Sequence, residues 1–439
     1  MDNRLNILYI SHYFPPEVNA PALRVSEMAA SWIDSGADVT VLTGFPNHPN
    51  GIIPERYKGL KSLCENFGKI KLVRTYLYAA PNKGFAKRIL NYLSFMFSSV
   101  ILGIRKIGKP DILIATSPQF FVAVAGYVIS RIKRCRFIFE VRDVWPEEIV
   151  AVGAIKNRLV IKALEALEMS LYRKADLVVA VAQGTIDILT KRGIPRSKLA
   201  LIPNGVNIDH FQDSSSGAIV RKELGLENDF VVTYLGTHGM AHKLETILES
   251  ADKLRQHRDI KFLFVGDGAE KSKLVSRAAQ MNLSNVIFHD QVDRERIPGF
   301  YHASDLFLVP LRKAKLFTKN VPSKVYEIMA ARKPIIISTE GESRRLIESA
   351  GAGMGAAPED AADIADKILR LYMDEGLRRK MGQDGYSFVL ANASRKRLAD
   401  EYLQILESVV SPATIDQEAV VVSETEEDVA YKTDIGVPA

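Results

Sequence analysis

The chain has 439 residues, 47% of them apolar and 25% charged, which excludes a largely disordered protein and allows two domains with sizeable cores. Its two cysteines, Cys64 and Cys135, are too few for a disulfide scaffold, and no apolar signal segment precedes the first expected strand, so we expect a cytoplasmic protein. The net charge of +6 is unevenly divided: residues 412–439 hold seven acids and one Lys, which leaves +12 on residues 1–411 and favours an anionic partner.

Short apolar runs, separated by helical or loop segments, fill the first half of the chain. They lie at residues 5–11, 38–43, 70–76, 111–116, 136–141 and 177–181. Such runs are typical of parallel strands that are buried on both faces and joined by crossover helices. We therefore predict a doubly wound α/β domain over residues 1–204.

The second half of the chain repeats this pattern. Its apolar runs lie at residues 230–236, 260–265, 285–288, 305–309 and 334–338, with helical segments at 243–256 and 269–281. Turn formers at Pro203-Asn204-Gly205 separate the two series, so a second Rossmann-like domain is predicted over residues 205–411, with last helices able to pack back on the first. Ligands of such sheets bind at the carboxyl ends of the strands, so we expect the site in the cleft between the domains. Residues 412–439 offer little to bury and are predicted to be a disordered tail.

Residues 83–109 form a basic amphipathic stretch. They contain six Lys or Arg, no acids, and an apolar part of about 14 to 16 residues that is too short and too polar to span a bilayer. An apolar face with basic ends suits a helix lying on an anionic membrane. The alternative is a core helix under the first sheet with solvated basic ends. No nucleic-acid-binding module accompanies the charge, so nucleic acid is not an expected partner.

The most informative stretch is residues 318–338. A Pro-Ser-Lys turn opens a helix of about three turns, and a buried Ile-Ile-Ile strand follows. The free N–H groups at the start of a helix suit an anion, and Lys324 adds a positive charge there. Glu327, one turn further on the same face, can accept hydrogen bonds from two ribose hydroxyls. Phosphate and ribose recognised side by side predict a nucleotide ligand.

This stretch resembles the nucleotide-sugar site of family 4 glycosyltransferases, which have the GT-B fold. Similar segments at 13–22, 202–207, 235–243 and 264–268 extend the resemblance over residues 5–405. The resemblance implies that the donor is bound by residues of both domains. These residues are Asn19, Ala20, Gly236, His242, Lys243, Gly266, Ser323, Lys324 and Glu327. Two alternatives stay open: His242 and Lys243 compete for one phosphate-binding position, and the loop at 13–22 could be an ordinary proline-rich turn.

Two positions depart from the family pattern. Family members carry a Glu eight positions before Glu327, where this chain has Lys319, and an Arg near the position of Thr237. These differences indicate either a different donor sugar or a site in which backbone N–H groups at 320–323 and Lys324 hold the diphosphate. They also leave open a non-catalytic partner subunit with a decayed site.

The loop at residues 139–148 follows a first-domain strand and contains four carboxylates. Its Arg-Asp-x-Trp-Pro sequence resembles a branch of the family that acts on amino sugars in bacterial surface polysaccharides. The resemblance implies that Asp143 is the acid/base or orienting carboxylate and that Arg142 contacts an anion, while Trp145 could stack on a sugar ring. The alternative is that Asp143 caps the following turn and Trp145 is packed in the core.

The resemblance as a whole implies a retaining, metal-independent glycosyltransferase. The expected reaction moves a sugar, in particular an N-acetylated amino sugar, from a UDP-linked donor to a polyprenyl-diphosphate-linked saccharide in O-antigen or lipopolysaccharide synthesis. No metal and no cofactor besides the donor is expected, since the chain has no Asp-x-Asp motif. Residues 83–109 would hold the enzyme at the inner face of the cytoplasmic membrane. A nucleotide-sugar 2-epimerase of the same fold remains an alternative, and it would need no acceptor.

Overall fold

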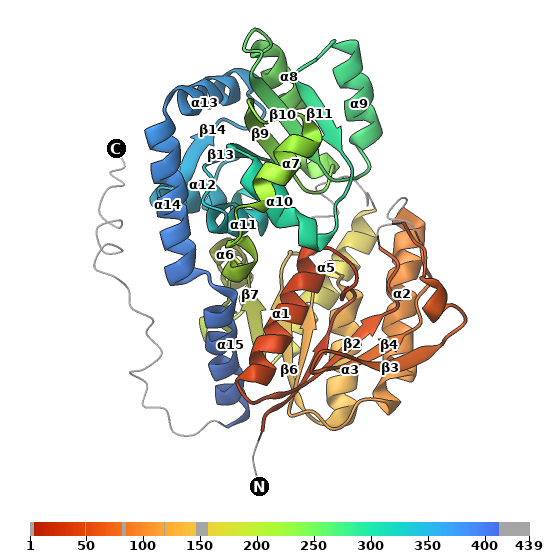
Figure 1. The fold of residues 1–439 in the computed structure, drawn as a ribbon. Helices are drawn as coiled ribbons and strands as arrows, with labels where there is room; N and C mark the ends of the chain where they lie inside the picture. Colours follow the sequence, from red (N-terminus) through yellow and green to blue (C-terminus); the bar gives the residue numbers. More distant parts are fainter. Residues whose placement is uncertain (1–3, 49, 81–84, 118, 146–156, 412–439) are drawn as a thin grey trace, which may run out of the picture.

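The computed structural model describes residues 4–48, 50–80, 85–117, 119–145 and 157–411, which build two α/β halves, each around its own sheet (Figure 1). The predicted fold class, two Rossmann-like units with doubly wound parallel sheets, is confirmed. The segment 412–439, predicted to be a disordered tail, lies outside the described residues.

The first sheet has eight strands in the order β3-β4-β2-β1-β5-β6-β7-β8. In chain order the strands are β1 (Asn6–Ile10), β2 (Asp38–Gly44), β3 (Ser62–Phe67), β4 (Ile70–Thr75), β5 (Ile112–Thr116), β6 (Arg136–Val141), β7 (Leu177–Ala180) and β8 (Leu199–Leu201). All neighbouring pairs are parallel except β3 with β4. Six strands match the predicted runs. β3 and β8 were not predicted, because β3 is a largely exposed edge strand without an apolar run and β8 is only three residues long.

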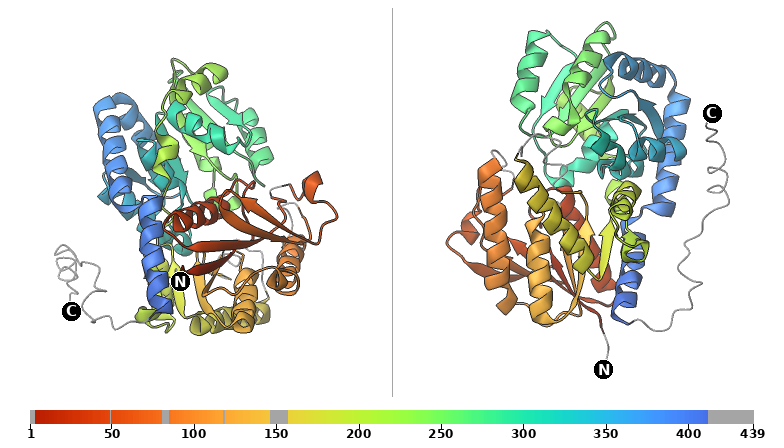
Figure 2. Two further views of the ribbon diagram at one scale, coloured as in Figure 1. Left: turned by 60° about the horizontal axis from the view of Figure 1, so that its bottom comes forward. Right: turned by 180° about the vertical axis from the view of Figure 1, so that it is seen from behind.

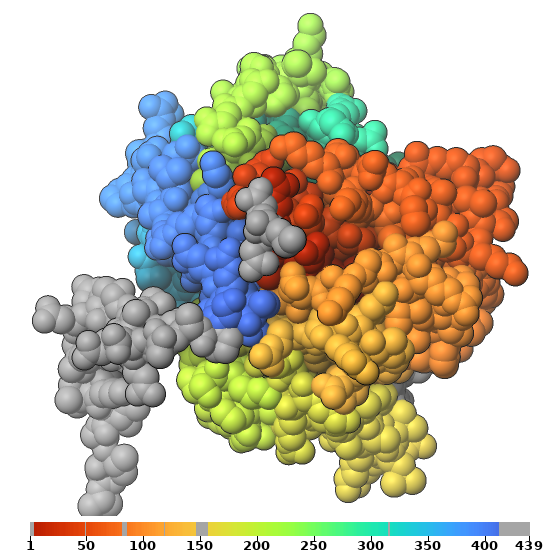
Figure 3. Space-filling model, turned by 90° about the horizontal axis from the view of Figure 1, so that it is seen from below, coloured from red at the N-terminus to blue at the C-terminus, as the bar shows by residue number. Residues whose placement is uncertain are grey.

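Helices cover both faces of the first sheet. On one face, α1 (Ala20–Asp34) and α15 (Arg395–Val410) bury Trp32 and Tyr402 in one core with Tyr9 of β1. The other face carries α2 (Phe85–Ile101), α3 (Phe121–Lys133), α5 (Arg158–Lys174) and α6 (Gln183–Lys191). α15 is the last helix of the described chain, and it packs on the first half of the molecule. Figure 3 shows this helix from below in blue.

The second sheet has six parallel strands in the order β11-β10-β9-β12-β13-β14. Its strands are β9 (Phe230–Leu235), β10 (Ile260–Val265), β11 (Val286–His289), β12 (Leu306–Pro310), β13 (Ile335–Ser338) and β14 (Gly353–Ala356). Its helices are α7 (Ser216–Leu224), α8 (Glu245–Lys253), α9 (Lys271–Gln280), α10 (Ile297–Ala303), α11 (Lys324–Ala330), α12 (Glu342–Ser349), α13 (Ala361–Met373) and α14 (Glu375–Asn392). β14 was not predicted, because its Gly-Met-Gly-Ala sequence has no strand propensity of its own.

The helix that follows the Pro-Ser-Lys turn is shorter than predicted. α11 spans seven residues, about two turns rather than three. It stops because Arg332 takes a left-handed conformation (φ 55°) and Pro334 leads the chain into β13.

The described part of the chain passes between the two halves near residues 205 and 393, and the two passages lie side by side. The Val206 N–H donates to the Ala393 carbonyl oxygen (2.9 Å), and the Arg395 N–H donates to that of Val206 (2.8 Å). Gly205 has φ 61°, and a Cβ there would stand 2.9 Å from the Ala393 carbonyl oxygen. The crossing therefore needs glycine at this position for both its conformation and its space.

A buried ion pair ties the first sheet to this crossing. Glu140, at the end of β6, accepts from Arg24 of α1 (3.0 Å), Tyr9 (2.8 Å) and Thr116 (2.6 Å). The remaining Arg24 donors reach the carbonyl oxygens of residues 202–204. Burial raises the pKa of Glu140, but the Arg24 charge and the hydrogen bonds outweigh burial and hold that pKa below its usual value. This carboxylate of the 139–148 loop is therefore structural.

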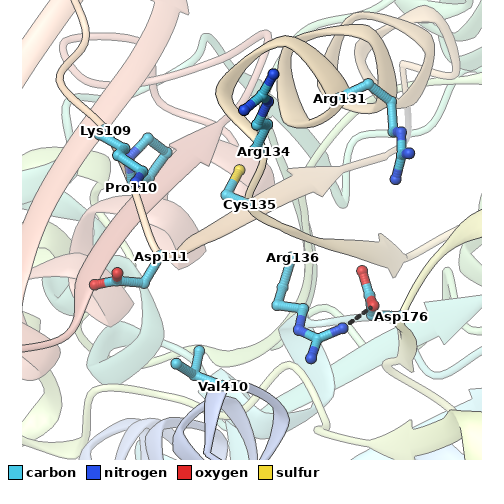
Figure 4. Close-up of a pocket in the computed structure, with 9 residues that line it drawn as sticks. All are labelled: Lys109, Pro110, Asp111, Arg131, Arg134, Cys135, Arg136, Asp176 and Val410. Carbon is cyan, nitrogen blue, oxygen red and sulfur yellow. Dashed lines mark hydrogen bonds and ion pairs between the residues drawn. The ribbon is translucent and has the colours of Figure 1, made fainter.

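A basic hollow of about 460 Å³ lies at the amino ends of β5 and β6, near the end of α15 (Figure 4). Arg136 in this hollow pairs with Asp176 (3.0 Å), whereas Lys109, Arg131 and Arg134 form no ion pair with any described residue. Parallel sheets bind ligands at the opposite, carboxyl ends of their strands. We therefore do not place the donor site here, although part of the positive charge of residues 1–411 gathers in this hollow.

Candidate active site

Two glycine loops at the carboxyl ends of β9 and β10 lie in direct contact. Gly236 (φ 142°) donates its N–H to the Val265 carbonyl oxygen (2.9 Å), and a Cβ on Gly266 (φ 134°) would stand 2.2 Å from the Gly236 carbonyl oxygen. The His238 N–H donates to the Asp267 carbonyl oxygen (2.9 Å). Both loops therefore form one rigid unit that only glycine permits at these two positions.

Lys324, the first residue of α11, reaches underneath this unit. Its Nζ lies 4.2 Å from the centroid of the Tyr234 ring, and a Cβ on Gly236 would stand 2.6 Å from it. Burial lowers the pKa of Lys324 to about 8, while the nearby Glu327 carboxylate acts in the opposite direction. The position concentrates a titratable positive charge where the loop after β9 meets the start of α11.

Glu327 lies one turn after Lys324 and is half-buried. Its Oε2 accepts from the hydroxyl of Tyr301 in α10 (2.6 Å). Burial, and then the Glu327 charge, raise the pKa of Tyr301, so its hydroxyl keeps the proton and acts as the donor. Tyr301 orients the carboxylate, and no sequence signal pointed to it because the two residues lie on different helices, 26 residues apart in the chain.

The two residues that compete for the phosphate position differ in charge. His242 lies with Nδ1 3.4 Å from the Pro310 carbonyl oxygen, and burial followed by the Lys324 charge lowers its pKa to about 3. His242 is therefore neutral at pH 7. Lys243 follows in a left-handed conformation (φ 45°) and is partly exposed. Of the two, Lys243 is the one that can bring a positive charge.

The histidines of this loop are not surface imidazoles. His238 is fully buried, and neither ring nitrogen has a hydrogen-bond partner among the described residues. Burial lowers the pKa of His238 to about 4, with Lys271 adding to the effect. His238 is therefore a packed neutral ring, and His242 is partly buried.

The segment that enters α11 lies against the first half of the molecule. Ser323 directly precedes the helix, and its carbonyl oxygen accepts from the Tyr326 N–H (3.1 Å). Lys319, at the position where the family has a Glu, packs on Gly184 of α6, where a Cβ would stand 2.6 Å from the Lys319 Cβ.

The loop at 13–22 is held in place by a buried carboxylate. Glu17 accepts from the backbone N–H groups of Asn47 and His48, each at 2.9 Å. Burial raises the pKa of Glu17 to about 7, although these N–H groups oppose the rise. Asn19 caps α1 by accepting from the Ala22 N–H (2.9 Å), and Ala20 is the first residue of that helix. The start of α1 is thus directed at the junction of the two halves (Figure 1).

Arg142 and Asp143 follow β6, and the hydroxyl of Ser117 accepts from both backbone N–H groups (2.7 and 3.3 Å). The Arg142 Nη1 is buried without a hydrogen-bond partner in the described part of the chain. Burial and the charge of Arg24 lower the pKa of Arg142, while Glu140 and Asp143 oppose this change. A buried guanidinium nitrogen with an unmet hydrogen bond suits an anionic ligand at this strand end.

Trp145 does not stand at this strand end as a sugar platform. Its ring is 6% exposed and stacks on Phe120, with centroids 5.0 Å apart and planes within 5°. The backbone N–H of Trp145 donates to the Glu168 Oε1 (3.0 Å). The stacking interpretation is therefore wrong and the packed alternative is right. Glu147 and Glu148 of the same loop lie outside the described residues.

Comparisons with known proteins match both halves. The protein-family model described as "Glycosyl transferase 4-like domain" matches residues 19–205, and the family model described as "Glycosyl transferases group 1" matches residues 218–388. WcaI of Escherichia coli K12, named as a candidate colanic acid biosynthesis glycosyl transferase, is 26% identical over 76% of this chain and 84% of its own. WbjE of Pseudomonas aeruginosa, named as a candidate glycosyltransferase, is 27% identical over 64% of this chain and 69% of its own.

Solved structures show the same fold. Sucrose-phosphate synthase of Thermosynechococcus elongatus superimposes with a TM-score of 0.72 at 18% identity, covering 93% of this chain and all of that one. HepE of Anabaena in complex with UDP and glucose superimposes with a TM-score of 0.70 at 17% identity, covering 92% of this chain and all of that one.

Proposed function

This chain belongs to the family 4 glycosyltransferases of the GT-B fold, and we propose that it moves an N-acetylated amino sugar from a UDP-sugar to a polyprenyl-diphosphate-linked saccharide. Glycosyltransferase activity follows from the family. The donor and acceptor are the proposal. It is supported by the name of WcaI, which refers to colanic acid biosynthesis, and by the UDP and glucose bound to HepE.

The observation that carries the donor assignment is the position of Lys324 beneath the Gly236 loop, with Glu327 one turn away. In the proposed reaction the bond between the anomeric carbon and the diphosphate oxygen breaks, and negative charge develops on the leaving diphosphate. Lys324, Lys243 and the backbone N–H groups of Asn320, Val321 and Ser323 stabilise that charge. The described residues hold no cluster of three His, Cys, Asp or Glu side chains that could bind a metal.

The acceptor side of the proposal uses the strand end after β6. Arg142 contacts an anionic group of the acceptor. Asp143 orients the hydroxyl that attacks the anomeric carbon, or accepts its proton. Attack on the face that the diphosphate leaves would retain the configuration. The proton of the attacking hydroxyl passes to the leaving diphosphate or to Asp143.

A screen of nucleotide sugars with the purified protein tests the proposed reaction. We expect hydrolysis or transfer with a UDP-linked N-acetylated amino sugar, undiminished in excess chelator. A strict requirement for magnesium or manganese would contradict the metal-independent mechanism. Conversion of free nucleotide sugar without an acceptor would favour the 2-epimerase, and no nucleotide binding at all would favour a non-catalytic subunit.

Replacing Glu327 by Ala should weaken binding of the nucleoside diphosphate by about 1.5–3 kcal/mol, the scale of a hydrogen bond to a charged group. In the proposed complex Glu327 accepts from the ribose hydroxyls, and Tyr301 holds its carboxylate in position. Calorimetry with UDP measures the effect. Glu340→Ala is the matched control, since Glu340 is an exposed carboxylate paired with Arg344. Equal affinity in parent and Glu327→Ala would sink the ribose assignment.

Membrane contact is proposed through the outer face of α2. The inner face of this helix is core, with Phe95 fully buried, whereas Leu90, Phe97 and Ile101 are 48%, 57% and 56% exposed. The neighbouring helix α3, which lies against α2 (Figure 2, right), also carries exposed apolar side chains, Val128 and Ile132. α2 is thus a core helix on its inner face, as the alternative predicted, and its outer face carries an exposed strip of apolar side chains. Among the described helices, none is both long and apolar enough to cross a bilayer.

Flotation with anionic and neutral vesicles tests this contact. The parent should bind anionic vesicles and dissociate as salt rises, because the Debye length is about 8 Å at physiological ionic strength. Phe97→Asp and the pair Lys87→Glu/Arg88→Glu should each abolish most of the binding. Ile219→Asp, at an equally exposed position on α7, is the control. Binding that is absent in the parent or untouched by these changes would leave a soluble acceptor as the better assignment.

A further inference from the structure

A carboxylate of the second half of the molecule caps a helix of the first half. Glu342 is the first residue of α12, just after β13. Its Oε1 accepts from the Gln183 N–H (2.8 Å) and its Oε2 from the Gly184 N–H (2.6 Å), the first two residues of α6. Both oxygens of one carboxylate thus bind the free N–H groups of a helix that lies about 160 residues away in the sequence.

α6 cannot cap itself. The residue at its N-cap position is Ala182, which has no side-chain acceptor. Negative charge at a helix N-terminus is also favoured by the helix dipole. Burial raises the pKa of Glu342, whereas the Gly184 and Gln183 N–H groups oppose this rise. The cap that the sequence of α6 lacks is therefore supplied by the other half of the chain.

The cap also fixes the segment that leads into the donor site. A Cβ on Gly184 would stand 2.8 Å from the Lys319 carbonyl oxygen and 2.9 Å from the Glu342 Oε2. Gly341 has φ 94°, and a Cβ there would stand 1.9 Å from the Thr318 carbonyl oxygen. Residues 318–319 are therefore enclosed between the start of α6 and the backbone before α12. The next residues along the chain are 320–324.

We propose that Glu342 is a positioning residue for glycosyl transfer, which joins the two halves through α6 and holds residues 318–323 in register for the donor diphosphate. It does so without touching the donor. The inference rests on the proposed function for the identity of the donor, but the contact itself does not. A second contact across the halves, from Arg294 to Glu27 of α1, lies on separate elements and serves as a comparison.

Hydrogen exchange tests the cap without any substrate. In Glu342→Ala, the amides at the start of α6 should exchange about tenfold faster or more, the scale of a lost N-cap, and peptides over 316–323 should also exchange faster. Glu342→Gln keeps one acceptor oxygen and should give a smaller change. Glu340→Ala, which alters only an exposed pair with Arg344, should leave both regions unchanged. Unchanged exchange in Glu342→Ala would overturn the proposal.

Kinetics with the active UDP-sugar test the positioning role. Glu342→Ala removes the acceptor from this contact, and Gly184→Ala adds a methyl group to it. Both variants should raise the donor KM about tenfold while changing kcat less. Glu27→Ala should not reproduce this division. If Glu342→Ala exchanges faster at α6 but keeps the parental KM, the positioning role is wrong although the cap is real. If the parent binds no UDP-sugar, the donor assignment fails. The hydrogen exchange of residues 316–323 then takes the place of the donor KM as the deciding measurement.

Discussion

Arg24→Ala should lower the free energy of unfolding of the first half by about 3–5 kcal/mol, because it leaves the fully buried Glu140 carboxylate without its counterion. The variant also removes the donors that bind the carbonyl oxygens of residues 202–204, so the crossing between the halves should loosen as well. Denaturant unfolding followed by tryptophan fluorescence measures the effect. Both tryptophans of the chain, Trp32 and Trp145, lie in the cores of the first half and report its unfolding.

The control for this prediction is an exposed ion pair on the same half. Lys69 pairs with Asp34 at 2.7 Å, with both side chains more than half exposed. Lys69→Ala should change the free energy of unfolding by less than about 1 kcal/mol. A loss for Arg24→Ala as small as that of the control would show that Glu140 is protonated or solvated once its partner is removed.

Lys324 should make donor binding depend on pH. Its pKa of about 8 in the ligand-free protein means that the side chain is charged below pH 8 and neutral above it. Affinity for UDP should therefore be constant below pH 8 and fall up to about tenfold for each pH unit above it, because the diphosphate requires the ammonium form. Titration calorimetry between pH 6.5 and 9.5 measures the profile.

Lys324→Met should lower kcat/KM by about 10²–10³, the scale of removing one preorganised charge stabiliser. Its UDP affinity should be low at every pH, without the fall above pH 8. The matched control is Lys273→Met, which removes an exposed lysine of α9. A slope above pH 8 that persists in Lys324→Met would assign the titration to another group and the diphosphate contact with it.

Local sequence patterns were sufficient where one segment determines its own structure. The apolar runs predicted eleven of the fourteen strands found in the described residues, because a strand buried on both faces must be apolar along its length. β3, β8 and β14 escaped because they are exposed, very short or glycine-rich, and they form only by pairing with a strand already in place. α11 was overestimated, since the left-handed Arg332 ends it before the proline signal.

Side chains whose environment depends on distant segments were harder to interpret. Phe95 lies in the stretch predicted to contact a membrane and Trp145 in the loop predicted to contact a sugar, yet both belong to the core of the first half. An aromatic side chain looks the same in the sequence whether it faces solvent or a neighbouring helix. The side of α2 that stays exposed is decided by the packing of its other side on the sheet.

The two α/β halves, the glycines at the carboxyl ends of β9 and β10, and the shared helical face of Lys324 and Glu327 could all be predicted, since each depends on residues close together in the chain. The partners of these residues became known only from the folded structure. Tyr301 orients Glu327, Lys324 lies beneath the Gly236 loop, and Glu342 caps α6. These contacts join segments 26 to about 160 residues apart, and the folding of both sheets brings them together where no local periodicity records the partner.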